Sequence, residues 1–149
     1  MQIVKYAPAF KADCIAIFKS NLPKFFAAEE LEFFENFLDH VIDGHYYVAK
    51  IDDLLIGCGG IFFDKNNDEA GLAWGMVDVK YHKQGIGKLL TQFRIDLLKE
   101  MYPEKKIKIE TSQHTAEFYK KNGFHIVDIL PDGFGTGIDK YTMQMEFRR

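Results

Sequence analysis

The chain has 149 residues, of which 47% are hydrophobic, and a formal net charge of −3. These values fit one folded domain with a sizeable core and exclude a disordered chain. Basic residues are interleaved with acidic ones, and no apolar run approaches the roughly 20 residues that cross a bilayer, so we expect neither nucleic-acid binding nor a membrane span.

Cysteine usage and the first residues bear on location and metal binding. Cys14 and Cys58 cannot form a disulfide framework and have no partners at zinc-ligand spacing. Residues 1–14 lack the cationic segment and apolar block of a secretory signal. We therefore expect a cytoplasmic protein with reduced thiols and no metal site.

The first part of the chain predicts one strand and two helices. Residues 3–6 can form a strand, and helical spacing of apolar residues predicts a helix over 9–22 that stops before Pro23. A second helix is predicted from about 28 to 42, with Gly44 as its terminator. Its buried face would comprise Leu31, Phe34, Phe37, Leu38 and Val41.

Residues 45–52 and 54–64 predict two strands, and a polar turn at 66–68 leads into a strand over 72–79. Short turns between consecutive strands imply an antiparallel meander. Glycines in the second strand would weaken it unless another backbone packs closely or a bulge is present. These glycines are Gly57, Gly59 and Gly60.

The stretch 72–101 passes from a strand through a glycine-containing turn into an amphipathic helix. The first turn of a helix presents unpaired backbone N–H groups and positive potential. Gly85 and Gly87 let a phosphate approach the backbone, and Lys83 and Lys88 add positive charge. The pattern favours a diphosphate-binding site over a plain glycine turn. The apolar residues of the helix are Leu89, Leu90, Phe93, Leu97, Leu98 and Met101.

Two familiar nucleotide-binding loops do not fit this stretch. A Walker loop would need glycine where the chain has His82, and Ser or Thr where it has Leu89. A Rossmann fingerprint would need a third glycine in place of Leu90. A flavin- or nucleotide-binding function is therefore disfavoured.

The last third of the chain predicts three more strands and a short helix. Thr111 or Ser112 would cap the helix, and Asn122-Gly123 would end it. The loop 131–139 would either gate an acceptor or simply connect a hairpin. The strands are expected over 106–110, 124–130 and 141–147.

The elements together predict one fold class. We expect a single α/β (α+β) domain over residues 1–149, because no linker, repeat or low-complexity segment interrupts the pattern. Its sheet would be mixed and mostly antiparallel, with about seven strands flanked by about four helices.

Two motifs resemble those of the GNAT acetyltransferase superfamily. A strand followed by HKQGIG is similar to its motif A, although His82 stands where Arg or Gln is usual. The later strand and short helix are similar to its motif B, with Ser112 where Asn is usual. The motif B match depends on Tyr119, Gly123 and Phe124.

The resemblance implies acetyl-CoA as co-substrate and assigns roles by position. The acetyl group and pantetheine arm would contact the backbone of Gly75, Met76 and Val77, with Ser112 as a further hydrogen-bonding group. Tyr119 would assist the departing CoA thiolate. The pyrophosphate would lie on a phosphate cradle formed by Lys83, Gln84, Gly85, Ile86, Gly87 and Lys88.

Acidity supports the role of the tyrosine and calls for a base. A phenol with a pKa of about 10 is protonated at neutral pH and can donate to a thiolate whose thiol has a pKa of about 8.5. An amine acceptor must lose a proton to attack. Glu110 is the first candidate base, ahead of Glu69, Asp78 and His114.

The sequence therefore predicts an N-acetyltransferase that moves the acetyl group of acetyl-CoA to a primary amine of a small molecule or peptide by direct attack. A non-catalytic acyl-CoA sensor or interaction module is the alternative, because His82 and Ser112 depart from the pattern. The many aromatic residues also allow for a homodimer. Candidate walls of the acceptor pocket are Phe25, Phe26, Tyr46, Trp74, Asp132 and Phe134.

Overall fold

The computed structural model describes residues 1–40 and 44–147, which contain one seven-stranded sheet and four α-helices. The strand order is β1-β2-β3-β4-β5-β7-β6, and only the β4–β5 pair is parallel. This confirms the predicted α/β (α+β) class. The strands are β1 (Gln2–Lys5), β2 (Tyr46–Ile51), β3 (Leu54–Asp64), β4 (Glu69–Val77), β5 (Lys106–Thr111), β6 (His125–Gly135) and β7 (Ile138–Glu146). The helices are α1 (Lys11–Ser20), α2 (Glu30–Asp39), α3 (Ile86–Met101) and α4 (Ala116–Lys121).

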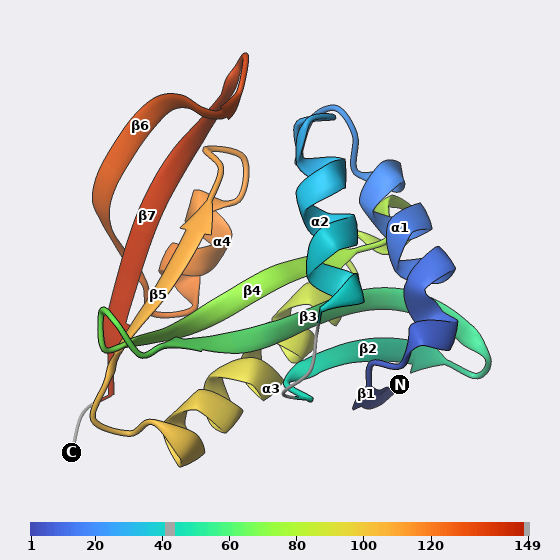
Figure 1. Cartoon of the computed structure of the whole chain (residues 1–149), viewed down its shortest axis with the longest axis horizontal. Coiled ribbons are helices and arrows are strands. Elements are labelled where there is room, and N and C mark those ends of the chain that lie inside the picture. Colours follow the sequence, from blue (N-terminus) through green and yellow to red (C-terminus); the bar gives the residue numbers. More distant parts are fainter. Residues whose placement is uncertain (41–43, 148–149) are drawn as a thin grey trace.

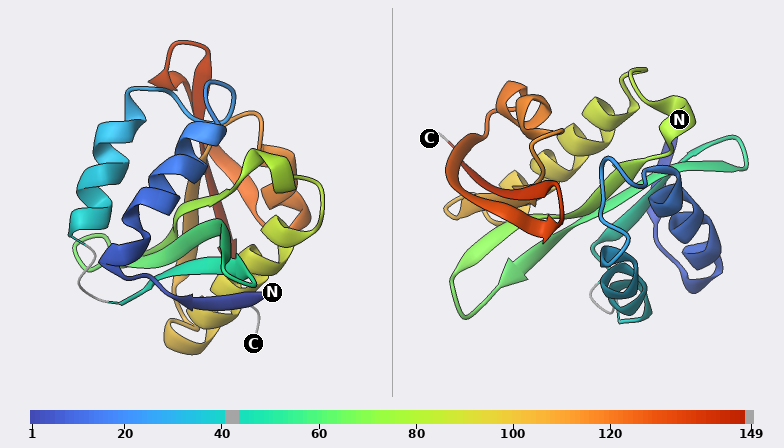
Figure 2. Two further views of the ribbon diagram at one scale, coloured as in Figure 1. Left: turned by 90° about the vertical axis from the view of Figure 1, so that its right-hand side faces the viewer. Right: turned by 90° about the horizontal axis from the view of Figure 1, so that it is seen from above.

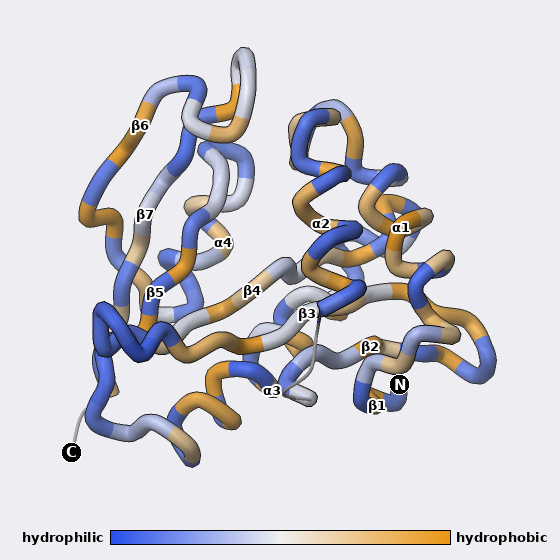
Figure 3. Tube along the Cα trace, in the orientation of Figure 1, coloured by the Kyte–Doolittle hydropathy of each residue, from blue (hydrophilic) through white to orange (hydrophobic). Residues whose placement is uncertain are grey.

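The helices cover opposite faces of the sheet. Helices α1 and α2 lie on one face, and α3 and α4 lie on the other (Figures 1 and 2). Hydrophobic residues follow β3 and β4 between these layers (Figure 3). On the α1–α2 face, Phe18 stacks on Phe26 and Phe34 with ring centroids 4.8 and 5.5 Å apart. The burial of these apolar rings supplies much of the driving force for this half of the fold.

A β-bulge interrupts β4 where three glycines of β3 pass beside it. Cys58 pairs with Met76 and Gly60 with Ala73, so Gly59 alone opposes two residues, Trp74 and Gly75. Trp74 adopts φ 47, and its carbonyl accepts a hydrogen bond from Tyr46 Oη at 2.7 Å. A Cβ on Gly60 would lie 2.3 Å from the His45 carbonyl oxygen. Both expected reasons for glycine in this strand, a bulge and a close backbone, are confirmed.

Strands β4 and β5 pair over a very short distance and then diverge. Their register contains only Ala70–Ile107 and Gly71–Lys108 among the described residues. Beyond these pairs β4 stays with β3, whereas β5 stays with β7 (Figure 1). The open edge of β4, which is the edge past Gly71 that faces away from β3, therefore has no strand partner.

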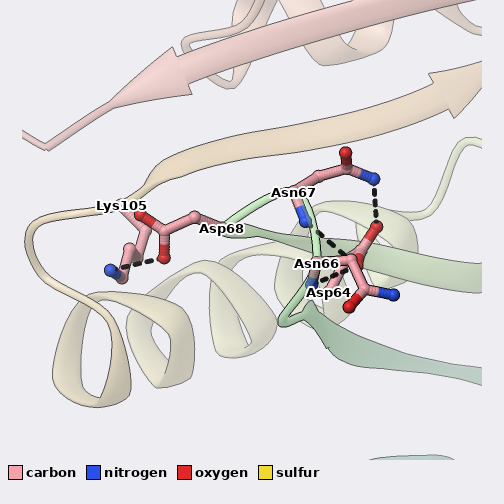
Figure 4. A network of polar contacts seen from close by, with 5 residues as sticks. All are labelled: Asp64, Asn66, Asn67, Asp68 and Lys105. Carbon is pink, nitrogen blue, oxygen red and sulfur yellow. Dashed lines mark hydrogen bonds and ion pairs between the residues drawn. The ribbon is translucent and has the colours of Figure 1, made fainter.

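Polar contacts stabilise the paired end of β4 and β5 (Figure 4). In the β3–β4 turn, the Asp64 carboxylate accepts hydrogen bonds from the side chain and backbone of Asn67 and from the backbone of Asn66, and these bonds lower the pKa of Asp64. Asp68, just before β4, forms an ion pair with Lys105, just before β5, with Oδ1 and Nζ 2.6 Å apart. These contacts hold together the two strand starts from which the divergence begins.

Several predicted helix limits differ from the structure. The first helix is preceded by a 3-10 turn, η1 (Pro8–Phe10), because proline suits the start of a helix rather than its interior. The second helix ends at Asp39, so Gly44 is not its terminator. Val41 of the predicted face and Ile42, the predicted last residue, lie outside the described residues. Neither Thr111 nor Ser112 is the N-cap of α4; Thr115 is, because β5 continues through Thr111 and a turn follows.

Of the six apolar residues predicted along one face of α3, only Leu90 and Leu98 are buried. Leu89 and Met101 are exposed, and Phe93 and Leu97 are only half-buried. The core instead receives a face that includes a threonine and an arginine. This face consists of Ile86, Leu90, Thr91, Arg94, Ile95 and Leu98.

The segment 131–139 is a hairpin connection and not a long loop. Strand β6 continues to Gly135, and Gly135 pairs with Ile138 across the turn. A Cβ on Gly135 would lie 2.7 Å from Ala27 Cβ, so this hairpin touches the connection between α1 and α2. Within residues 1–40 and 44–147, no helix has the length and apolar character needed to cross a membrane.

Glu30 is a buried acidic residue at the start of α2. Its side chain is 9% exposed, and its Oε2 accepts a hydrogen bond from the Ala27 N–H at 2.8 Å. Burial raises the pKa of Glu30 from 4.5 to about 7, the Ala27 bond opposes the rise, and the charge of Glu29 adds to it. Folding therefore disfavours the ionised form of this carboxyl group.

Glu30→Gln keeps an oxygen for the Ala27 N–H and removes the titrating charge. Because the folded-state pKa is raised, the wild type loses stability as pH rises from 4.5 to about 7. At about 1.4 kcal/mol per pKa unit, the loss is up to about 3 kcal/mol. Urea unfolding should show the variant more stable than wild type at pH 8 and nearly equal to it at pH 4.5. An equal difference at both pH values would contradict this account.

Candidate active site

The phosphate cradle lies in the connection between β4 and α3 and in the first turn of α3. A 3-10 turn, η2 (Val79–Tyr81), follows β4, and Gly85 is the N-cap of α3 in the left-handed region, with φ 82. A Cβ on Gly85 would meet nothing within 4 Å. No described residue accepts a hydrogen bond from the backbone N–H groups of residues 83–88. These amides are therefore free to bind an anion beside the positive end of the helix.

The open edge of β4 presents backbone groups next to the cradle. The Asp78 N–H donates to Ile56 of β3, at 2.8 Å. Because peptide groups alternate along a strand, those of Val77 and Gly75 face the opposite, open edge. Met76 pairs with Cys58 of β3, and its side chain is buried in the core formed with α1 and α2. Of the three predicted residues, Gly75 and Val77 thus lie best for contact with a ligand.

Two side chains already bind the carbonyl of Val77. Asn21 Nδ2, at the end of α1, and His82 Nε2, in the loop before the cradle, each lie 2.9 Å from this oxygen. Both can donate when His82 is protonated on Nε2. No sequence pattern pointed to Asn21, whose partner is far away along the chain. His82, which departs from the motif A pattern, thus binds the strand.

Tyr119 lies on α4, and its ring packs in the core. It is 7% exposed and lies edge-on to the rings of Phe118, at 5.0 Å, and Phe124, at 5.9 Å. Its hydroxyl hydrogen-bonds to none of the described residues. A Cβ on Gly87 would be 3.8 Å from both Phe118 and Val77, so α4, the cradle and β4 meet here.

Ser112 lies in the turn between β5 and α4. Its Oγ accepts the His114 N–H at 3.2 Å, and its carbonyl accepts the N–H groups of Thr115 and Ala116. The side chain is 4% exposed. In this structure Ser112 therefore organises the turn that precedes α4.

The four candidate bases are placed very differently. Glu110 is exposed and forms an ion pair with Lys140, with Oε2 and Nζ 3.6 Å apart. Asp78 accepts the N–H of Lys80, and the ring of His114 faces Phe25. Glu69 begins β4 and lines a polar cavity of about 480 Å³ at the paired end. The structure therefore places Glu69 at the opposite end of β4 from the cradle.

Phe25 lies between the segment that follows β4 and the segment that follows β5. Its ring is 5.1 Å from that of His82, beyond β4, and 6.3 Å from that of His114, beyond β5. Both contacts are edge-on, and Lys24 Nζ lies 5.2 Å from the centre of the Phe25 ring. The sequence predicted Phe25 as a wall of an acceptor pocket, but its position between two histidines was not foreseen.

Of two other predicted pocket walls, Tyr46 belongs to the core, and Trp74 is half-buried and packs against it. Tyr46 is 1% exposed, and burial raises the pKa of its hydroxyl. Trp74 packs against Phe34 and Phe37 with ring centroids 5.1 and 6.4 Å apart. A separate cavity of about 300 Å³ lies beside the start of α2 and is lined by Ala28, Glu29, Leu31, Glu32 and Glu35.

Solved structures share this fold. Ard1 from Thermoplasma volcanium has a TM-score of 0.80 at 18% identity, with 99% of this chain and 98% of that chain covered. The ribosomal-protein-S18-alanine N-acetyltransferase of Escherichia coli has a TM-score of 0.78 at 17% identity, with 99% and 94% covered. An aminoglycoside 6′-N-acetyltransferase in complex with coenzyme A has a TM-score of 0.73 at 18% identity, with 97% and 96% covered.

Sequence comparison identifies the family. A comparison with curated proteins gave no match. The family described as "Acetyltransferase (GNAT) domain" matches residues 43–126, which run from before β2 to the start of β6 and include the whole cradle. Because this match covers more than half of the chain, the protein belongs to the GNAT acetyltransferase family and is an acyltransferase.

Proposed function

We propose that the protein transfers the acetyl group of acetyl-CoA to a primary amine. The observation that carries this proposal is the set of free amides at residues 83–88, which adjoins the open edge of β4. A pyrophosphate on the cradle would direct the pantetheine arm along this edge. That one of the structures with this fold holds coenzyme A supports the choice of co-substrate.

In the proposed reaction, the nitrogen lone pair of the acceptor attacks the thioester carbon, and the carbonyl electrons move onto the oxygen. Backbone N–H groups at Gly75 and Val77 stabilise this oxyanion. The intermediate then collapses, the C–S bond breaks, and the CoA thiolate takes a proton from Tyr119 Oη. A base receives the proton that the amine loses. The base then releases its proton to solvent and Tyr119 takes one up from solvent, which restores both groups.

Glu110 remains the proposed base. It is exposed near the end of β5, where a carboxylate can accept a proton directly or through water, and the Lys140 ion pair holds it on the surface. The acceptor is proposed to be a small molecule or a peptide with a free amine. The related folds include one named for an aminoglycoside and one named for a ribosomal protein, which spans both kinds of acceptor. A cytoplasmic location and a homodimer also stay proposals.

One observation favours the alternative of a non-catalytic acyl-CoA sensor. The Val77 carbonyl, which faces the open edge, already accepts hydrogen bonds from Asn21 and His82. A pantetheine amide would have to compete with these donors for the same oxygen. Titration calorimetry with acetyl-CoA, followed by a thiol-release assay against a panel of amines, separates the two functions. Binding with acetyl loss to no acceptor would favour the sensor, and absence of binding would defeat both.

Gly87→Glu and Gly87→Gln test the cradle as a matched pair. A Cβ at this position would make only ordinary van der Waals contacts, with its nearest neighbours 3.8 Å away, so both variants should fold. Glutamate adds negative charge beside the expected pyrophosphate, whereas glutamine adds the same bulk without charge. Calorimetry should show acetyl-CoA affinity falling about tenfold further for Glu than for Gln. Equal affinities at low salt would argue against an anion at this site.

Tyr119→Phe tests the proton donor. Phenylalanine keeps the ring contacts with Phe118 and Phe124 and removes only the hydroxyl. Loss of a general acid typically lowers turnover by about 10²-fold or more, so kcat should fall while the acetyl-CoA dissociation constant changes little. Tyr102→Phe, at the far end of α3, is the control and should leave both constants unchanged. Wild-type kcat in Tyr119→Phe would remove this residue from the mechanism.

A further inference from the structure

Arg94 is a buried cation in the middle of α3, directly beneath the β4 bulge. Its side chain is 1% exposed. A Cβ on Gly75 would lie 2.4 Å from Nη2, and a Cβ on Gly59 would lie 3.2 Å from Cζ. Glycine at these two positions therefore lets the guanidinium group lie against the backbone of both strands.

The guanidinium group is poorly compensated. Nη1 lies 3.4 Å from the Gly60 carbonyl and Nη2 lies 3.3 Å from Thr91 Oγ1, and both distances are long for hydrogen bonds. Within the described part of the chain, Nε has no hydrogen-bond partner. No carboxylate of residues 1–40 or 44–147 forms an ion pair with it. A buried charge of this kind is costly unless some other charge offsets it.

The position of the bulge suggests which negative charge offsets the positive charge of Arg94. Gly75, which the guanidinium group contacts, presents its peptide to the open edge of β4, where the acetyl carbonyl is proposed to bind. We propose that Arg94 is a positioning residue for acyl transfer, whose uncompensated positive charge beneath the bulge favours the negative charge that develops on the thioester oxygen. This inference rests on the proposed acetyltransferase function.

The physical basis is that the field of an unneutralised charge extends further in a protein interior than in water, because the interior is poorly polarisable. A carboxylate partner would cancel the field of the guanidinium group within a few ångströms, and no such partner is present among the described residues. Arginine also keeps its charge at every pH at which the protein is folded. The field is therefore constant and needs no rearrangement as the oxyanion forms, which is the property of a preorganised site.

A purely structural role predicts a different outcome. In that case Arg94 only fills the space beneath two glycines, and a side chain of similar size would replace it without chemical consequence. Arg94→Met is similar in length and neutral. Arg94→Lys keeps the charge, and Arg94→Gln keeps a hydrogen-bond donor without charge. Ile95→Val is the control, because it alters the neighbouring buried position of α3, away from the bulge.

Kinetics provide the first measurement. Arg94→Met should lower kcat by roughly 10- to 100-fold and leave the acetyl-CoA dissociation constant nearly unchanged. Arg94→Lys should recover most of the loss, Arg94→Gln should not, and Ile95→Val should match the wild type. Thermal unfolding shows which variants are folded, and Gln replaces Met as the neutral variant if Met does not fold. A folded neutral variant with wild-type kcat would overturn the inference.

The second measurement needs no acceptor. Acetyl-CoA labelled with ¹³C at the thioester carbonyl is bound to the wild type and to each variant, and its carbonyl resonance is recorded. A cation near the oxygen polarises the carbonyl, so binding to the wild type should shift the resonance downfield, and the neutral variants should lose most of this shift. An equal shift in both would overturn the inference even if no turnover is found. A wild type that binds no acetyl-CoA would instead overturn the proposed function, and the inference with it.

Discussion

The divergence of β4 from β5 is the constraint on which the rest of the structure depends. Two residue pairs join these strands, next to the Asp68–Lys105 ion pair, and each strand then follows a different neighbour. A sheet normally pairs its backbone groups along the whole strand. Here a row of backbone groups is left available along β4, and α3 begins at the end of that row with its own free amides. One irregularity thus supplies both halves of the proposed acetyl-CoA site.

Glycines leave the space that the irregular part of β4 and its neighbours need. Gly59 and Gly75 admit the Arg94 guanidinium group, and Gly60 admits the backbone at His45. The strain falls on Trp74, whose left-handed conformation is held by the Tyr46 hydroxyl and by aromatic packing from α2. Local conformations of this kind persist when surrounding packing determines them, and they are common at functional sites.

Much of the fold could be predicted from the sequence because it depends on local pattern. The alternating strands, their antiparallel meander and the glycine junction before α3 follow from residue spacing, whereas the order of the strands in the sheet was not predicted. The buried face of α3 could not be predicted, because Arg94 occupies a position that apolar residues normally fill, between Leu90 and Leu98. An arginine four residues from a leucine on either side was the available signal. Asn21, which binds Val77, left no signal, because their contact spans the fold.

The central claim is that the free amides at the start of α3 bind the pyrophosphate of acetyl-CoA. Backbone ¹H–¹⁵N spectra of the protein, recorded during titration with acetyl-CoA, test it residue by residue. The account predicts that the amide protons of Gly85 and Gly87 move downfield as they donate to phosphate oxygens, while that of Gly123, beyond α4, stays in place. Saturation by acetyl-CoA without a change at Gly85 or Gly87 would contradict it.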